Sequence, residues 1–239
     1  MPDRLALVTG ANRGIGLEAA RALARAGVTV LVGSRDLGDG EEAAASLDPA
    51  EGRGGHGAVA LDVTDADSVA AAVAEADRRG GLDVLVNNAG LYLTPPAGDG
   101  DGPALATEID VYRRTFDVNV LGPLRLAQAA MSGMAERGWG RVVNVSSGYG
   151  AFAAQDGDGP SAYRLSKLAL NGLTRQLAGE AGPGVLVNAV GPGWVKTRMG
   201  GPGANREPED AGTDVAWVAL LPDDAPTGQF FSEREPRDW

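Results

Sequence analysis

Short apolar runs alternate with longer helical patterns along almost the whole chain, and this rhythm constrains the fold more than any other feature. The runs are nearly continuous in apolar residues, as is typical of strands buried on both faces of a parallel sheet. The expected strands are 5–8, 28–33, 57–61, 82–86, 141–146 and 185–190, and the expected helices are 14–26, 39–47, 65–80, 107–137 and 161–180. We therefore predict an α/β fold: a Rossmann-type, doubly wound parallel sheet of about seven strands with helices on both faces.

The chain has 239 residues and shows no repeat, low-complexity tract or linker that would divide it. We expect one domain over residues 1–239, a length that a single α/β core can reach. The Gly-, Asp- and Pro-rich stretch 95–103 is typical of a surface loop. The stretch 194–212 has no apolar periodicity and follows the last expected strand. Because ligands bind at the carboxyl ends of strands in open α/β sheets, we expect 194–212 to form a lid.

Composition argues against several classes of function. The net charge of −11 disfavours nucleic acid, whose phosphates would be repelled. No apolar run approaches the ~18 residues that cross a bilayer, and the N-terminal residues enter a strand pattern without a signal peptide. We therefore expect a cytoplasmic protein that binds neither nucleic acid nor membrane. The chain has no cysteine, and its one histidine, His56, lies in an expected surface loop, so we predict no metal site.

Three glycines mark the junction of the first strand with the first helix, in the segment TGANRGIG. Gly10, Gly14 and Gly16 permit a tight turn in which backbone N–H groups approach a ligand closely. The helix N-terminus adds a partial positive charge, so a pyrophosphate fits there. A plain turn in a chain with 36 glycines is the alternative. The position after the first strand of a βαβ unit favours dinucleotide binding.

The segment after the second strand, Ser34-Arg35-Asp36, bears on the choice of cofactor. An acid at the end of this strand binds the ribose 2′-hydroxyl of NAD, whereas arginine accommodates the 2′-phosphate of NADP. The first position is the uncharged Ser34, and both Arg35 and Arg13, from the glycine loop, can reach one phosphate. Asp36 is the competing signal for NAD, although it lies one residue later. We therefore predict NADP(H).

Tyr163 and Lys167 stand four residues apart in a chain that contains only two lysines. This spacing places them on one face of a helix. An ammonium near the phenol would lower its pKa from the ordinary value near 10, while burial would raise it. The balance of the two effects can give a proton donor whose pKa lies closer to neutral.

The motifs occur in the order TGANRGIG, SRD, LDVTD, NNAG, FDVNV, VVNVSS, YRLSK and VGPGWVKTRMGG, and with them the chain resembles a short-chain dehydrogenase/reductase of the carbonyl-reductase-like kind. The motifs cover nearly the whole chain. The resemblance implies a catalytic tetrad of Asn119, Ser147, Tyr163 and Lys167. It also implies a cofactor site formed by Gly10, Asn12, Arg13, Gly14, Ile15, Gly16, Ser34, Arg35, Asp62, Val63, Asn88, Ala89, Gly90, Tyr163, Lys167, Pro192, Gly193, Val195 and Thr197.

In such an enzyme Tyr163 protonates a carbonyl oxygen that Ser147 holds. Lys167 also bonds the nicotinamide ribose, and Asn119 holds a water that links Lys167 to solvent. The family's serine usually lies about thirteen residues before the tyrosine, whereas Ser147 lies sixteen before Tyr163. The intervening loop is therefore longer, and Ser146 remains an alternative.

The resemblance implies an NADPH-dependent reductase of a ketone or aldehyde. The alternatives are an NADP-dependent alcohol dehydrogenase and a non-catalytic NADP-binding regulator, which would be expected to lose Tyr163 or Lys167. The expected substrate residues are Leu91, Tyr92, Ser147, Tyr149 and Trp194.

The helix over 161–180 has an apolar face opposite the catalytic one, and the resemblance implies a homodimer or homotetramer formed through it. Its residues are Leu165, Leu168, Ala169 and Gly172. The competing interpretation is a monomer in which the longer loop, 148–160, covers this face.

Overall fold

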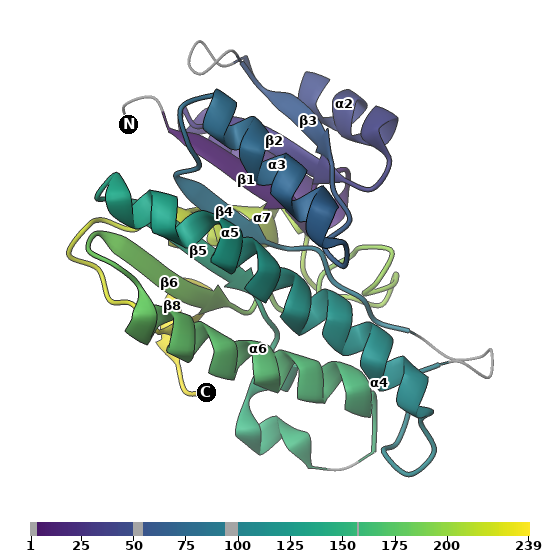
Figure 1. Ribbon diagram of the computed structural model, residues 1–239. Helices are drawn as coiled ribbons and strands as arrows, with labels where there is room; N and C mark the ends of the chain where they lie inside the picture. The colour runs from purple at the N-terminus through teal and green to yellow at the C-terminus, as the bar shows by residue number, and fades with distance from the viewer. Residues whose placement is uncertain (1–3, 50–54, 94–99, 157) are drawn as a thin grey trace.

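A single sheet organises the chain in the computed structural model, which describes residues 4–49, 55–93, 100–156 and 158–239. Within these residues the sheet has eight strands in the order β3-β2-β1-β4-β5-β6-β7-β8 (Figure 1). All neighbours pair in parallel except β7 and β8. The strands are β1 (Leu5–Thr9), β2 (Thr29–Ser34), β3 (Gly57–Ala60), β4 (Val84–Asn87), β5 (Gly140–Val145), β6 (Val185–Val190), β7 (Phe230–Ser232) and β8 (Glu235–Arg237). The predicted doubly wound parallel sheet is confirmed.

Helices cover both faces of this sheet. The helices are α1 (Gly14–Arg25), α2 (Leu37–Ala45), α3 (Ala66–Arg78), α4 (Ile109–Phe116), α5 (Gly122–Glu136), α6 (Ser161–Glu180) and α7 (Pro208–Ala219). Side chains of α1 and α7 bury one face, and those of α3, α5 and α6 bury the other. In Figure 1, α3, α5 and α6 lie in front of the sheet, with α7 behind it.

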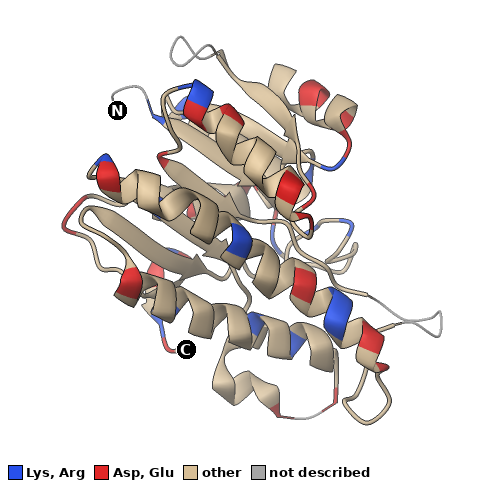
Figure 2. Ribbon diagram, viewed as in Figure 1, with Lys and Arg blue, Asp and Glu red and all other residues tan. Residues whose placement is uncertain are grey.

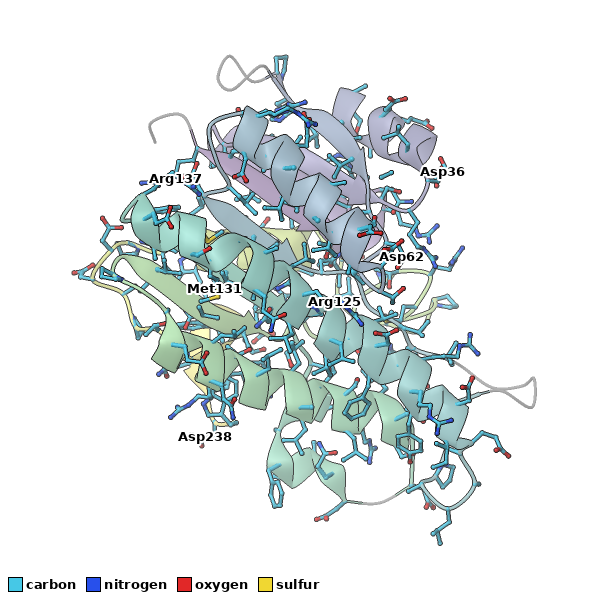
Figure 3. All side chains as sticks on the ribbon, viewed as in Figure 1. Asp36, Asp62, Arg125, Met131, Arg137 and Asp238 are labelled. Atoms are coloured by element: carbon cyan, nitrogen blue, oxygen red, sulfur yellow. The ribbon has the colours of Figure 1, made fainter. Side chains whose placement is uncertain are left out.

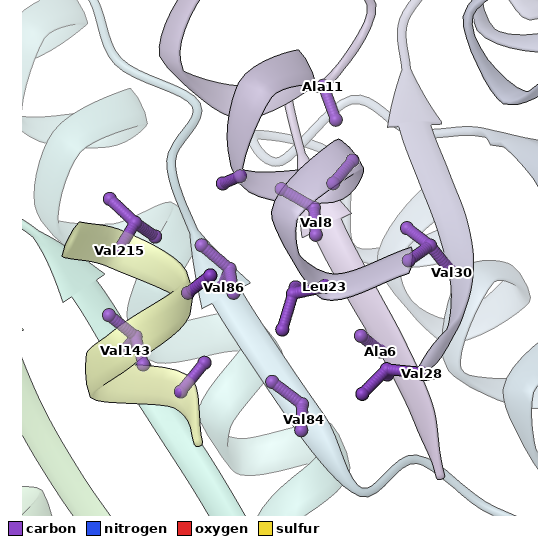
Figure 4. Packing of buried hydrophobic residues seen from close by; sticks show 14 of the residues in the cluster. Ala6, Val8, Ala11, Leu23, Val28, Val30, Val84, Val86, Val143 and Val215 are labelled. Atoms are coloured by element: carbon purple, nitrogen blue, oxygen red, sulfur yellow. The ribbon is translucent and has the colours of Figure 1, made fainter. Parts of the chain in front are cut away.

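The side-chain alternation of β1 shows why both faces need cover. Ala6 and Val8 point into the cluster with α1 and α7, where Leu23, Val84 and Val215 pack around them (Figure 4). Leu5 and Leu7 point into the opposite cluster. Successive side chains of a strand point to opposite faces, so a strand with two buried faces must be apolar throughout.

The expected helix over 107–137 is interrupted. A short π-helical segment, Asp117–Leu121, separates α4 from α5, and buried Asn119 lies at its centre. Such π-turns are rare and occur mainly at functional sites.

The C-terminal part of the fold differs most from the sequence expectation. Helix α7 was not predicted, and its first residues are those assigned to the end of the lid. A Cβ on Gly212 would lie 2.5 Å from the Glu18 main chain of α1, so the two helices pack backbone to backbone. Residues 208–212 of the expected lid are therefore helical, and residues 194–207 precede the helix. The short strands β7 and β8 were also not predicted. No helix in the described part of the chain has the length and apolar character to cross a membrane.

Candidate active site

The glycine loop lies at the carboxyl end of β1 and leads into α1. Gly10 and Gly14 have φ values of +62° and +57°, a region that favours glycine. A Cβ on Gly16 would lie 2.6 Å from the carbonyl oxygen of Gly10, so this position also requires glycine. Helix α1 has no acidic residue in its first turn and no side-chain cap. Its N-terminal N–H groups are left for an anion, and the loop therefore fits a pyrophosphate.

Asn88 supports the glycine loop from the end of β4. Its Nδ2 donates to the carbonyl oxygens of Thr9 and Gly10, at 2.8 and 3.2 Å. The Thr9 hydroxyl in turn accepts the N–H groups of Asn88 and Ala89. The amide of Asn88 thus shapes the loop, which places the turn Asn88–Gly90 beside the expected cofactor path.

Among the residues expected to select the cofactor, Ser34 and Asp36 are held within the fold, whereas the side chains of Arg13 and Arg35 are exposed. Ser34 is buried at the end of β2. Asp36 is the N-cap of α2 and accepts the N–H of Asp39 at 3.0 Å, which gives its carboxylate a structural role. Arg13 and Arg35 are exposed, and neither guanidinium group makes a hydrogen bond or ion pair with another described residue. Two uncommitted guanidinium groups at this edge fit a phosphate ester.

Asp62 lies at the same edge, after β3 (Figure 3). Its carboxylate accepts the main-chain N–H and the hydroxyl of Thr64, at 2.9 and 2.7 Å. These two hydrogen bonds, with the charges of Arg35 and Arg125, lower the pKa of Asp62. The Val63 side chain packs toward Gly122 of α5, and its carbonyl oxygen accepts from Arg125 at 3.3 Å. Asn12 donates to Asp39, and Ile15 packs on the core cluster around α1.

Tyr163 and Lys167 lie one turn apart on α6, next to the carboxyl end of β5. Lys167 is 4% exposed, and its Nζ donates to the carbonyl oxygen of Val145 at 2.9 Å. The same nitrogen lies 5.6 Å from the centre of the Tyr163 ring. The ammonium therefore lies near the Tyr163 ring and is held by the end of β5.

Burial shifts the pKa values of both members of this pair. Burial raises the pKa of Tyr163 to about 12, although its hydrogen bond with the Ser147 side chain acts in the other direction. Burial lowers the pKa of Lys167 to about 8. Of the two opposing effects considered from the sequence, burial therefore dominates the pKa of Tyr163. At neutral pH the phenol is protonated.

The structure distinguishes the two candidate serines. Ser147 is hydrogen-bonded to Tyr163 and accepts the N–H of Tyr149 at 3.2 Å. Ser146 is buried, and its hydroxyl donates to Asn171 Oδ1 at 2.6 Å, away from Tyr163. The geometry brings Ser147 to the phenol and leaves Ser146 in the core.

Asn119 is brought close to this group and is almost fully used by protein contacts. Its Nδ2 donates to the carbonyl oxygen of Leu91 and to Ser166 Oγ, at 2.9 and 3.0 Å. Its Oδ1 accepts the N–H of Leu91 at 2.7 Å. Both amide hydrogens are engaged, so the side chain clamps the loop after β4 to α6.

Aromatic side chains flank Tyr163 on the expected substrate side. The ring of Tyr92 lies 5.2 Å from that of Tyr163, and the ring of Tyr149 lies 6.5 Å away, centre to centre. Burial, with the charge of Asp101 next, raises the pKa of Tyr92. Trp194 is 58% exposed and donates to the carbonyl oxygen of Gly200 within its own segment. Tyr92, Tyr149 and Tyr163 thus form an aromatic cluster, and Trp194 packs within its own segment.

The segment 192–207 approaches the glycine loop. A Cβ on Gly14 would lie 3.3 Å from the Thr197 side chain. The ends of the segment are joined by hydrogen bonds between Trp194, Lys196 and Arg206. Arg206 also donates to the carbonyl oxygen of Pro192 at 2.8 Å. Val195 is buried, and Gly193 has a φ of +81°. The segment 192–207 therefore forms an arch whose two ends are joined by these hydrogen bonds.

Sequence reasoning missed Asp101 and Ser166. Asp101 belongs to the stretch expected to be a surface loop, yet it is only 2% exposed. Residues 95–99 of that stretch lie outside the described residues. The sequence held one sign that another segment must cap α6, because the helix follows Pro160, whose side chain cannot accept a hydrogen bond. The source of the missing cap could not be read from the sequence.

A glycine loop that fits a pyrophosphate, a half-buried tyrosine one turn from a buried lysine, and a serine beside the tyrosine are together typical of a dinucleotide-dependent redox site. The family model of short chain dehydrogenases matches residues 4–207. The chain belongs to this family of oxidoreductases, whose members use NAD or NADP.

Individual relatives agree with this assignment. Over 199 residues the chain is 39% identical to the short-chain reductase protein NovJ of Streptomyces niveus, covering 82% of this chain and 71% of that protein. It is 38% identical over 195 residues to a galactitol 2-dehydrogenase (L-tagatose-forming) of Cereibacter sphaeroides, covering 81% and 72%. A solved structure of a short chain dehydrogenase/reductase family protein matches with a TM-score of 0.79 and 34% identity, covering 96% of this chain and 94% of that one.

Proposed function

We propose that the protein is an NADPH-dependent reductase that converts a ketone or aldehyde carbonyl to an alcohol. The observation that carries this proposal is the protonated Tyr163 phenol, hydrogen-bonded to Ser147 and with Lys167 behind it. The reduced nicotinamide supplies the hydride when bound. The residues of this chain bind the substrate carbonyl and deliver the proton.

The proton transfer follows from the site geometry. Ser147 and Tyr163 together can hold one carbonyl oxygen, and Tyr163 Oη gives its proton to that oxygen as hydride reaches the carbon. The charge of Lys167 stabilises the phenolate that remains. Because burial lowers the pKa of Lys167 to about 8, this residue can release a proton near neutral pH and help restore the phenol.

The protonation state of Tyr163 favours its role as an acid in carbonyl reduction. With a pKa of about 12, Tyr163 keeps its proton at neutral pH and acts as an acid. The similarity to a galactitol 2-dehydrogenase is the observation in favour of the reverse reaction, NADP-dependent alcohol oxidation.

The choice of NADPH rests on the positive charges of Arg13 and Arg35. The guanidinium groups of Arg13 and Arg35 are exposed and make no hydrogen bond or ion pair in the described part of the chain, whereas Asp36 caps α2. The other residues that would hold the cofactor are the glycine loop, residues 62–63, Asn88–Gly90 and residues 192–197 of the arch.

A kinetic comparison tests both parts. Ketones and aldehydes are assayed with NADPH and NADH, and alcohols with NADP⁺, by following the absorbance of the reduced cofactor. We expect kcat/KM to be at least about tenfold higher with NADPH, as one charge-assisted contact implies. Equal use of NADH contradicts the cofactor assignment. Turnover of alcohols alone at neutral pH contradicts the direction.

We also infer that the protein forms a homodimer, or a tetramer of dimers, through α5 and α6. Figure 2 shows few charged positions along these two helices. Leu121 and Leu165 are 43% and 41% exposed, and nothing lies within 4 Å of a Cβ on Gly172. The 148–156 loop docks through Asn171 and leaves this face open, which argues against the monomer alternative. An isologous contact between copies would cover it.

A further inference from the structure

Helix α6 begins without a cap of its own, and a distant loop satisfies its first N–H groups. Ser161 N–H donates to the carbonyl oxygen of Gly102 at 3.0 Å. Ala162 N–H donates to Asp101 Oδ1 at 3.0 Å, and Tyr163 N–H donates to Asp101 Oδ2 at 2.7 Å. Both carboxylate oxygens of Asp101 are therefore committed to the helix turn that carries the catalytic phenol.

Asp101 is fixed on its own side of this contact. It is 2% exposed, and its N–H donates to the carbonyl oxygen of Leu93 at 2.6 Å. The next residue, Gly102, donates to Thr107 Oγ1 at 2.9 Å. A buried carboxylate at a helix N-terminus is favoured by the helix dipole and by charge-assisted hydrogen bonds. The loop therefore holds a rigid anionic cap against α6.

The opposite side of the Tyr163 peptide is also fixed. Its carbonyl oxygen accepts from Ser166 Oγ at 2.7 Å, and Ser166 Oγ accepts from Asn119 Nδ2. Asn119 binds both main-chain groups of Leu91. The hydrogen bonds thus form a ring that leaves Tyr163 through Asp101, passes along 91–93 and Asn119, and returns through Ser166.

We propose that Asp101 is a positioning residue of the reductase reaction, which fixes Tyr163 relative to the substrate-side segment Leu91–Leu93. This inference rests on the proposed function. The ring connects the proton donor and the loop that carries Tyr92, so their separation is set by hydrogen bonds and not by packing alone. Misplacement of a reacting group by about 1 Å can cost about a hundredfold in rate, so a small shift of this turn matters.

The test compares Asp101→Ala and Asp101→Asn with a destabilising control. We expect kcat per cofactor-binding site to fall at least about tenfold in Asp101→Ala, while Kd for NADPH changes less than about threefold. Asn keeps one acceptor oxygen, so Asp101→Asn should lie between Ala and wild type. The control is Val28→Ala, a core position just before β2, in the cluster with α1 and α7 on the other face of the sheet (Figure 4).

Val28→Ala separates positioning from loss of stability. If Asp101 only stabilised the fold, its variants would lower Tm and the fraction of active sites, as Val28→Ala does, and leave the single-turnover rate per site unchanged. That result overturns the proposal. A reduced single-turnover rate at full cofactor stoichiometry, seen in the Asp101 variants and absent in Val28→Ala, supports it.

A second measurement applies even if no substrate is turned over. An enzyme that binds NADPH but turns over no carbonyl or alcohol contradicts the proposed function. Amide exchange of Ala162 and Tyr163 still reports on the cap, and it should accelerate at least about tenfold in Asp101→Ala relative to Val28→Ala. Equal exchange in the two variants overturns the positioning role of Asp101.

Discussion

Lys167 Nζ donates to the carbonyl oxygen of Val145, the last residue of β5, at 2.9 Å. This bond anchors the ammonium to the end of the sheet, with the Tyr163 ring nearby. It offsets only part of the desolvation, since burial still lowers the pKa of Lys167 to about 8 from an ordinary 10.5. The residue is thus held in a position that costs folding free energy.

The pH dependence of stability should reveal this cost. Below pH 8, Lys167 is charged in both the folded and unfolded states, so the full penalty of about 3 kcal/mol is present. Between pH 8 and about 10.5 the unfolded chain binds more protons, so wild-type stability should rise with pH relative to Lys167→Met. Urea unfolding of both proteins at pH 7 and pH 10 measures the change. Lys196→Met, which removes an exposed lysine, is the control and should show no such rise. A constant difference between wild type and Lys167→Met would contradict the lowered pKa.

Tyr163→Phe should abolish turnover and retain the cofactor. The ring and its contacts with Tyr92 and Tyr149 remain, while the proton donor and its bond to Ser147 are lost. A general acid contributes ~10²–10⁴-fold, so kcat should fall by at least about a hundredfold. NADPH titration should give a Kd within a few-fold of wild type. Retention of more than about a tenth of kcat would show that another group supplies the proton.

Cofactor selection should depend on Arg13 and Arg35. A charge-assisted hydrogen bond contributes ~1.5–3 kcal/mol, so replacing either arginine by Ala should weaken NADPH binding by roughly 10- to 150-fold. NADH binding should barely change, because NADH lacks the 2′-phosphate. Arg25→Ala, an exposed arginine at the other end of α1, is the matched control. Equal weakening of NADH and NADPH would mean that the two arginines do not contact that phosphate.

Residues 194–207 of the arch should close over the bound cofactor. Its Thr197 already lies against Gly14, and its base is joined by the hydrogen bonds of Arg206 with Trp194 and Lys196. Hydrogen exchange should therefore slow in 194–207 when NADP⁺ and an alcohol product are added, while α3 stays unchanged as an internal reference. Equal exchange with and without ligand would contradict a lid.

Light scattering tests the proposed contact through α5 and α6. The chain has a mass of 24.3 kDa, so a mass near that value at micromolar concentration would rule out the dimer. Leu168→Glu should shift the protein to the monomer, because it places an unpaired charge in the contact. Ala70→Glu introduces the same charge at an exposed position of α3 and should leave the mass unchanged.

Periodicity predicted the strands and helices that have long apolar faces, and glycine chemistry predicted the phosphate loop. Strands of three residues, such as β7 and β8, are too short to show a period. The π-turn at Asn119 depends on partners in two other segments, Leu91 and Ser166. Asp101 reads as a loop residue because its partners are 61 and 62 residues away. The pKa of Tyr163 could not be predicted because its sign depends on burial, which spacing alone does not determine.

The last strand has a consequence for how copies of the chain meet. Glu235, Pro236 and Arg237 of β8 are all exposed, and proline has no N–H to donate. A short edge strand that carries charges and a proline is a poor template for pairing with another sheet. This edge therefore resists the strand-to-strand aggregation to which open sheets are prone, and leaves association between copies to helical surfaces.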